Sequence, residues 1–159
     1  MAKRVPANLF SLRLRPSKNL VGRLGIWLRP RSVRRARTDA TWHMHKLAGK
    51  KAYREGGYDE AEKEFVAALK RAEGFGPQDP RLGASLNNLA MVYKQQGKLG
   101  KAEIHLKRAL RVFEIVKPDH AHVASVLHNL AAIYDAQGKP AAADPLRKRA
   151  DAILAGGVG

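Results

Sequence analysis

Apolar residues in the middle of the chain recur with the spacing of a helix. Leu82, Leu86, Leu89 and Tyr93 follow one another at steps of four, three and four residues, which places their side chains on one face of a helix. Gly97 follows, where a helix commonly ends in a left-handed residue that glycine adopts at little cost. The pattern therefore predicts an amphipathic helix that ends just before this glycine.

A second apolar stripe follows the glycine and predicts a second helix. It runs from Leu99 to Phe113 and includes Leu106, with small residues at Ala102 and Ala109. Two amphipathic helices joined by a short turn form an antiparallel hairpin. Alanine suits the places where two helix backbones lie too close for a larger side chain.

The same hairpin pattern returns 41 residues later. LNNLAMVYKQQGK (86–98) is matched by LHNLAAIYDAQGK (127–139), and a weaker copy upstream has Gly56, Ala61 and Ala68 in the equivalent places. A fixed period of about 20 to 50 residues indicates stacked supersecondary units. We therefore expect three helix hairpins, none stable alone, each covering the apolar face of its neighbour.

Turn residues and a polar last helix set the limits of these units. Asp79 before Pro80 predicts an N-cap followed by a first-turn proline. Arg147 and Asp151 stand where the preceding unit has leucines, and a polar final helix is what a repeat without a successor requires. The array is therefore expected to be complete at three units. Pro145 is expected near the first turn of the last helix, where its missing N–H costs little.

These units resemble tetratricopeptide repeats. LNNLA, a following tyrosine, a turn glycine, AE and KRAL resemble the long repeats of kinesin light chains, and AGKKAYREGGYDEAEKEFVAAL resembles the common shorter pattern. The resemblance implies an all-α fold, a short right-handed solenoid of three helix-turn-helix repeats, whose first helices line a concave face that holds a peptide or partner protein. It covers about residues 42–155, with repeats near 42–76, 79–117 and 120–155 and a flexible tail at 156–159.

In the resembled family, inward-facing positions of the first helix of each repeat contact the ligand. Asn88 and Asn129 are the strongest candidates, because a carboxamide offers a donor and an acceptor to the backbone of an extended peptide. The alternative is that they make hydrogen bonds within the protein. The full candidate set comprises Lys46, Lys50, Tyr53, Arg54, Asn87, Asn88, Met91, Lys94, Gln95, His128, Asn129, Ala132 and Asp135.

The first unit supplies the most basic wall of this candidate groove, which favours acidic ligands, although a solvated lysine face is an equal alternative. Some tetratricopeptide domains hold a C-terminal carboxylate with a set of Lys, Asn and Arg side chains. Lys46 and Asn88 fit that set, whereas Lys50, Ser125 and Asn129 stand where it needs other residues. We therefore do not expect such a clamp.

No pattern in the chain indicates catalysis, a cofactor or a metal. Cysteine is absent, and the sequence holds no phosphate-binding glycine loop, nucleophile elbow or HExxH motif. His43 and His45 are two residues apart, as are His120 and His122, so the members of each pair point to different faces of a helix. We predict a protein that is not an enzyme.

Positive charge is concentrated at the N-terminus. Of the 30 Lys and Arg in a chain of net charge +16, 11 lie in residues 1–41, where Asp39 is the single acidic residue. This basic leader has the composition of a mitochondrial presequence, of a segment that binds anionic membranes or nucleic acid, or of a disordered segment preceding a true start at Met44. We expect it to be mostly disordered, because five residues interrupt any helix: Pro6, Pro16, Pro30, Gly22 and Gly25.

The sequence thus predicts a non-enzymatic scaffold that binds a peptide or protein segment, with acid favoured in the partner. The alternative function is binding of nucleic acid or an anionic membrane through residues 1–41. A homo-oligomer is a further possibility, since three short units leave two ends exposed. We expect a cytoplasmic protein, or a mitochondrial one if the leader is a presequence. No segment approaches the roughly 20 apolar residues that span a bilayer.

Overall fold

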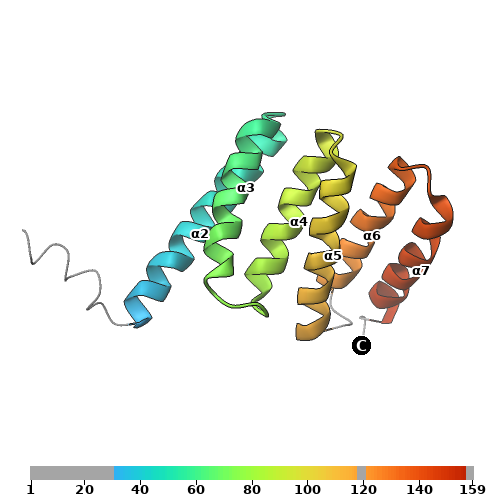
Figure 1. Cartoon of the computed structure of the whole chain (residues 1–159). Coiled ribbons are helices and arrows are strands. Elements are labelled where there is room, and N and C mark those ends of the chain that lie inside the picture. Colours follow the sequence, from blue (N-terminus) through green and yellow to red (C-terminus); the bar gives the residue numbers. More distant parts are fainter. Residues whose placement is uncertain (1–30, 118–120, 157–159) are drawn as a thin grey trace, which may run out of the picture. The chain divides into compact units, whose positions relative to one another are not determined.

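The computed structural model describes residues 31–117 and 121–156 of the chain. Every secondary-structure element in these two ranges is an α-helix (Figure 1). The expectations for residues 1–30 of the leader and for 157–159 of the tail lie outside this description. The helices are α2 (Arg31–Arg54), α3 (Tyr58–Glu73), α4 (Pro80–Gln95), α5 (Leu99–Val116), α6 (Ala121–Ala136) and α7 (Pro140–Gly156).

Consecutive helices pack as antiparallel pairs. Helix α4 contacts α3 and α5, and α6 contacts α5 and α7, so the second hairpin is enclosed between the first and the third. Figure 1 shows the three pairs, α2–α3, α4–α5 and α6–α7, following one another along the chain. The all-α fold of three helix hairpins predicted from the 41-residue period is confirmed.

The turns within the hairpins are built alike. Gly56, Gly97 and Gly138 have φ of 79°, 72° and 72°, a left-handed conformation that favours glycine. After Gly97, the backbone N–H of Lys98 donates to the Tyr93 carbonyl at 2.8 Å, the hydrogen bond of a Schellman motif. The predicted glycine turns are confirmed.

Helix α4 begins as the sequence predicts. Asp79 is its N-cap, with extended backbone (φ −75°, ψ 129°), and Pro80 occupies the first turn. One Asp79 carboxylate oxygen accepts from the Arg81 backbone N–H at 2.9 Å. This bond satisfies one of the amide groups that a helix start leaves unpaired.

The core is a continuous layer of leucine, valine and alanine between the hairpins. Three leucines on successive helices are completely buried: Leu86 on α4, Leu106 on α5 and Leu127 on α6. The alanines expected at close helix contacts are at most 1% exposed, which confirms their role: Ala61, Ala68, Ala102, Ala109, Ala143 and Ala150. A larger side chain at these sites would force the helices apart.

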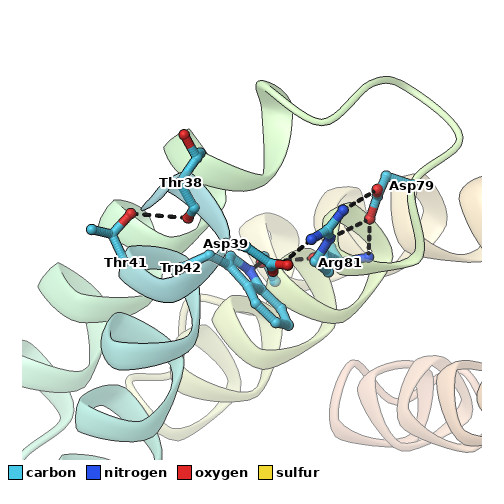
Figure 2. A network of polar contacts seen from close by, with 7 residues as sticks. Thr38, Asp39, Thr41, Trp42, Asp79 and Arg81 are labelled. Carbon is cyan, nitrogen blue, oxygen red and sulfur yellow. Dashed lines mark hydrogen bonds and ion pairs between the residues drawn. The ribbon is translucent and has the colours of Figure 1, made fainter. Parts of the chain in front are cut away.

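The first helix is longer than the repeat pattern indicated. Helix α2 starts at Arg31, so residues 31–41 of the expected leader are helical. Asp39, near the end of this stretch, contacts the second hairpin: Figure 2 shows the Arg81 guanidinium paired with Asp39 at 2.5 Å. The guanidinium also pairs with Asp79, the N-cap of its own helix, at 2.7 Å. The same guanidinium lies 3.5 Å from the centroid of the Phe75 ring.

Helix α7 differs from the expectation at its proline. It begins at Pro140, so Pro145 lies inside the helix, beyond the first turn. Its missing N–H removes the hydrogen bond that would reach back to the Ala141 carbonyl. Arg147 pairs with Asp135 of α6 at 2.8 Å, so the last helix carries ion pairs where the second unit has leucine. Among the described helices, none has the length and apolarity needed to cross a membrane.

Candidate functional site

Two neighbouring cavities lie along the face formed by the first helices of the hairpins. The larger, about 520 Å³, is the apolar cavity, lined by Leu47, Lys50, Tyr53, Arg54, Phe65, Asn88 and Met91. The smaller, about 260 Å³, is the polar cavity, lined by Lys46, Lys50, Ala84, Asn87, Asn88, Phe113, His122, Ser125 and Val126. Because Lys50 and Asn88 line both, the two cavities are adjacent, and together they are called the groove below.

Helices α2 and α4 bring most of the predicted residues into this groove. On α2, Lys46, Lys50 and Arg54 are four residues apart and share one helical face. On α4, Asn88 and Met91 are three residues apart and share another. The groove therefore combines a basic wall with an amide and a thioether.

The predicted residues of α6 are placed differently. His128 Nε2 lies 3.3 Å from an Asp151 carboxylate oxygen, and Asp135 pairs with Arg147. These two side chains therefore face α7, and neither lines a cavity of the groove. Helix α6 contributes His122, Ser125 and Val126 in their place.

Three further candidates lie outside the two cavities. Gln95 Nε2 donates to the Tyr53 hydroxyl at 3.0 Å, which ties the ends of α4 and α2 together. Lys94 is half-buried on α4, and Ala132 is half-buried on α6. The cavity linings do not include any of Lys94, Gln95 and Ala132.

The structure also adds groove residues that the sequence did not single out. Leu47 and Phe65 line the apolar cavity, and Phe113 lines the polar one. Leu47 lies three residues before Lys50, so its helical face was readable from the spacing. The two phenylalanines belong to second helices of hairpins, and only the packing of those helices brings them beneath the groove.

The asparagines of the groove have different surroundings. Asn129 Nδ2 donates to Asn87 Oδ1 at 2.9 Å, so these two join the second and third units. In residues 31–117 and 121–156, no side-chain hydrogen bond of Asn88 is found. Its carboxamide therefore keeps its donors and acceptor for another molecule.

The basic wall is not neutralised by acidic side chains. No Asp or Glu lines either cavity, and within the described ranges neither Lys46 nor Lys50 forms an ion pair. Burial lowers the pKa of Lys46, and repulsion from Lys50 lowers it further. Lys46 Nζ lies 4.4 Å from the centroid of the Trp42 ring, a cation–π contact. The groove thus presents positive charge and hydrogen-bond donors above an apolar floor.

Groups that could hold a metal ion are not found at this face. In the part of the chain that the structure describes, no cluster of three or more His, Cys, Asp or Glu side chains has the required arrangement. The polar groups that line the groove are amides, ammonium groups, hydroxyls, the Arg54 guanidinium and the His122 imidazole. Amide, ammonium, hydroxyl and guanidinium groups bind through hydrogen bonds and charge.

Comparison with known proteins identifies the fold. A family profile described as tetratricopeptide repeat matches residues 40–115, and a second with the same description matches residues 123–150. Among curated proteins the sequence has no match. Proteins built from these repeats generally mediate protein–protein interaction and are typically not enzymes.

Solved structures also resemble this chain, and 51 chains among them match it. One is the crystal structure of BtubC (BKLC) from P. vanneervenii, which is 30% identical over 73% of this chain, with a TM-score of 0.69. The similarity covers 46% of the BtubC chain, so this protein spans about half the length of that one. Since one tetratricopeptide profile matches the first two hairpins and another matches the third, the chain belongs to the tetratricopeptide-repeat family.

Proposed function

We propose that this protein is a non-enzymatic scaffold that holds an extended, acidic segment of a partner protein in the groove. The observation that carries the proposal is the position of Asn88. Its carboxamide lines both cavities and makes no hydrogen bond to another described residue. Such a group can pair with the backbone of a segment that runs from one cavity into the other.

The apolar cavity supports this function by offering a place for one side chain of the partner. Leu47, Phe65 and Met91 supply apolar surface, and Lys50 and Arg54 stand beside it. Burial of one large apolar side chain contributes about 1.5–3 kcal/mol. An aliphatic or aromatic residue flanked by acidic residues is the segment that this lining fits.

Charge supports the choice of an acidic partner. Lys46, Lys50 and Arg54 form a row on α2 with no acidic side chain in the cavities to offset it. Opposite charge on the partner speeds association, and added salt weakens this effect. Binding should therefore weaken as ionic strength rises.

A peptide-display library tests the proposal. The purified protein is used to select peptides, and the affinity of the selected peptides is measured by fluorescence anisotropy for the wild type, Asn88→Ala and Gln78→Ala. Gln78 lies in the exposed loop before α4 and serves as the control. Loss of hydrogen bonds from Asn88 should weaken binding by about tenfold or more. Peptides that bind Asn88→Ala as tightly as the wild type would place recognition elsewhere.

The alternative function, binding of nucleic acid or an anionic membrane, depends on the basic leader. Residues 1–30 of that leader lie outside the described ranges. Within the described ranges, the groove combines the Asn88 carboxamide with lysines that form no ion pair. The proposal rests on this surface.

A further inference from the structure

The polar cavity contains more positive charge than a simple backbone contact requires. Lys46 and Lys50 both line it, one helical turn apart, and no acidic side chain is among its lining residues. Two like charges at this spacing repel one another. A ligand group with two negative charges would remove that repulsion and form a charge-assisted hydrogen bond with each ammonium group.

The ammonium group of Lys46 is held in place before a ligand arrives. It lies 4.4 Å from the centroid of the Trp42 ring, which is only 7% exposed. Trp42 Nε1–H in turn donates to Ser85 Oγ at 2.8 Å, and the Ser85 hydroxyl donates to the Arg81 carbonyl at 2.8 Å. Figure 2 shows Trp42 and Arg81 in this network. A positioned charge loses little freedom on binding, which favours affinity.

Neutral donors complete the lining, together with the His122 ring, which stacks on Phe113. Asn87 Oδ1 accepts from Asn129, so the Nδ2–H groups of Asn87 remain as donors. Asn88 adds a second amide, and the exposed Ser125 adds a hydroxyl from α6. The set is therefore rich in donors that come from three helices.

The chemistry of this lining selects among anions. A carboxylate brings one charge and two oxygens, whereas a phosphate monoester brings a charge of about −1.5 to −2 and three acceptor oxygens. The phosphate monoester is the better match, in charge and in number of donors, for a lining of two ammonium groups, two amides and a hydroxyl. We propose that the polar cavity binds the phosphoryl group of a phosphorylated side chain in the partner segment. This inference rests on the proposed function, because Asn88 joins this cavity to the apolar one.

Nuclear magnetic resonance on the full chain tests the inference with small probes. Isotope-labelled protein is titrated at constant ionic strength with inorganic phosphate and with N-acetyl-O-phosphoserine methylamide. N-acetylaspartate methylamide and N-acetylglycine serve as carboxylate probes, the latter imitating a chain terminus. We expect saturable shifts of the Asn87 and Asn88 side-chain amides, with the phosphoserine probe binding about tenfold more tightly than either carboxylate.

A pair of matched variants separates the cavity from general charge attraction. Lys46→Gln combined with Lys50→Gln removes the two ammonium groups of the cavity. Lys51→Gln combined with Lys63→Gln removes the same charge at two exposed sites paired with Glu55 and Glu60. The cavity variant should weaken binding of the phosphoserine probe about tenfold or more and the control about twofold or less.

The outcomes are distinct from those of the peptide selection. Equal affinity for the phosphoserine and carboxylate probes, or equal weakening in both variants, would overturn the phosphoryl site. The proposed binding of unphosphorylated peptides in the groove would still stand. Saturable phosphoserine binding with no peptide selected would support the phosphoryl site and count against the peptide-binding scaffold. If the double variant proves unfolded in its own spectrum, Lys50→Gln alone, at an exposed position, is compared with Lys51→Gln.

Discussion

Gly83 and Gly100 lie within helices, yet only one of them is required by packing. A Cβ atom at Gly83 would lie 2.7 Å from Cζ of Phe113, whereas one at Gly100 would meet nothing within 4 Å. Gly83→Ala should therefore destabilise the protein by about 1–3 kcal/mol, because the ring must move. Gly100→Ala should stabilise it by about 0.5–1 kcal/mol through helix propensity. Urea unfolding of both variants measures the two changes, and equal stability of Gly83→Ala and wild type would show that the ring yields freely.

The roles of single asparagines could be predicted from the sequence only in part. Asn88 and Asn129 occupy equivalent places in the repeat and carried the same expectation. Asn88 lines both cavities, while Asn129 donates to Asn87 at 2.9 Å. The difference arises because a hydrogen bond depends on the offset of neighbouring helices, which a 41-residue period does not specify.

Neighbouring hairpins are also joined by polar contacts, and Glu103 is the centre of one group of them, between the second and third hairpins. Its carboxylate accepts from Lys107 Nζ at 2.6 Å on α5, and from Gln137 Nε2 at 3.0 Å and the Tyr134 hydroxyl at 3.2 Å in the third hairpin. The hydrogen bond from Lys107, followed by that from Gln137, lowers the pKa of Glu103 to about 2. The ionised carboxylate therefore stabilises the contact between the second and third hairpins.

This lowered pKa predicts a loss of stability in acid. A carboxyl whose pKa is lower in the folded than in the unfolded state stabilises the protein above the unfolded value, and that stability is lost as pH falls to the folded value. The window here runs from about pH 4.5 down to about 2. Glu103→Gln should remove about 1–2 kcal/mol of the acid dependence after allowance for solvent screening.

Thermal unfolding of the wild type and Glu103→Gln across this window measures the effect. Glu60→Gln is the matched control, because Glu60 pairs with Lys63 at 3.1 Å on an exposed face of a single helix. The control should follow the wild-type acid dependence. Parallel curves for wild type and Glu103→Gln would show that the carboxylate does not join the hairpins as proposed.

The start of the first helix shows where sequence periodicity stops being informative. Helix ends at Gly97 and Asp79 were predictable because they depend on local backbone chemistry. Residues 31–41 are rich in arginine and have no apolar stripe, yet α2 begins at Arg31. Asp39 and Trp42 are held by Arg81 and Ser85 of the next hairpin, and such contacts stabilise a helix whatever its pattern.

In the assembly of three hairpins, helix α7 carries polar side chains where the preceding repeat has leucines. Arg147 and Asp151 occupy the places of Leu106 and Leu110 in the preceding unit. Leu106 is completely buried, whereas the Arg147 side chain is 38% and the Asp151 side chain 69% exposed. Helix α7 therefore exposes less apolar surface than it would with leucine at both positions.

Restoring the leucines should make the molecule self-associate. Arg147→Leu combined with Asp151→Leu recreates the apolar stripe on α7, which in a repeat array is covered by the next unit. In the variant this stripe is exposed and available to a second molecule, and sedimentation velocity should show mass that rises with concentration. The control Lys148→Leu combined with Ala152→Leu adds the same residues at exposed α7 positions adjacent to that stripe. If both variants associate to the same extent, general hydrophobicity is the cause. If neither does, Arg147 and Asp151 are not what keeps this face of α7 from self-association.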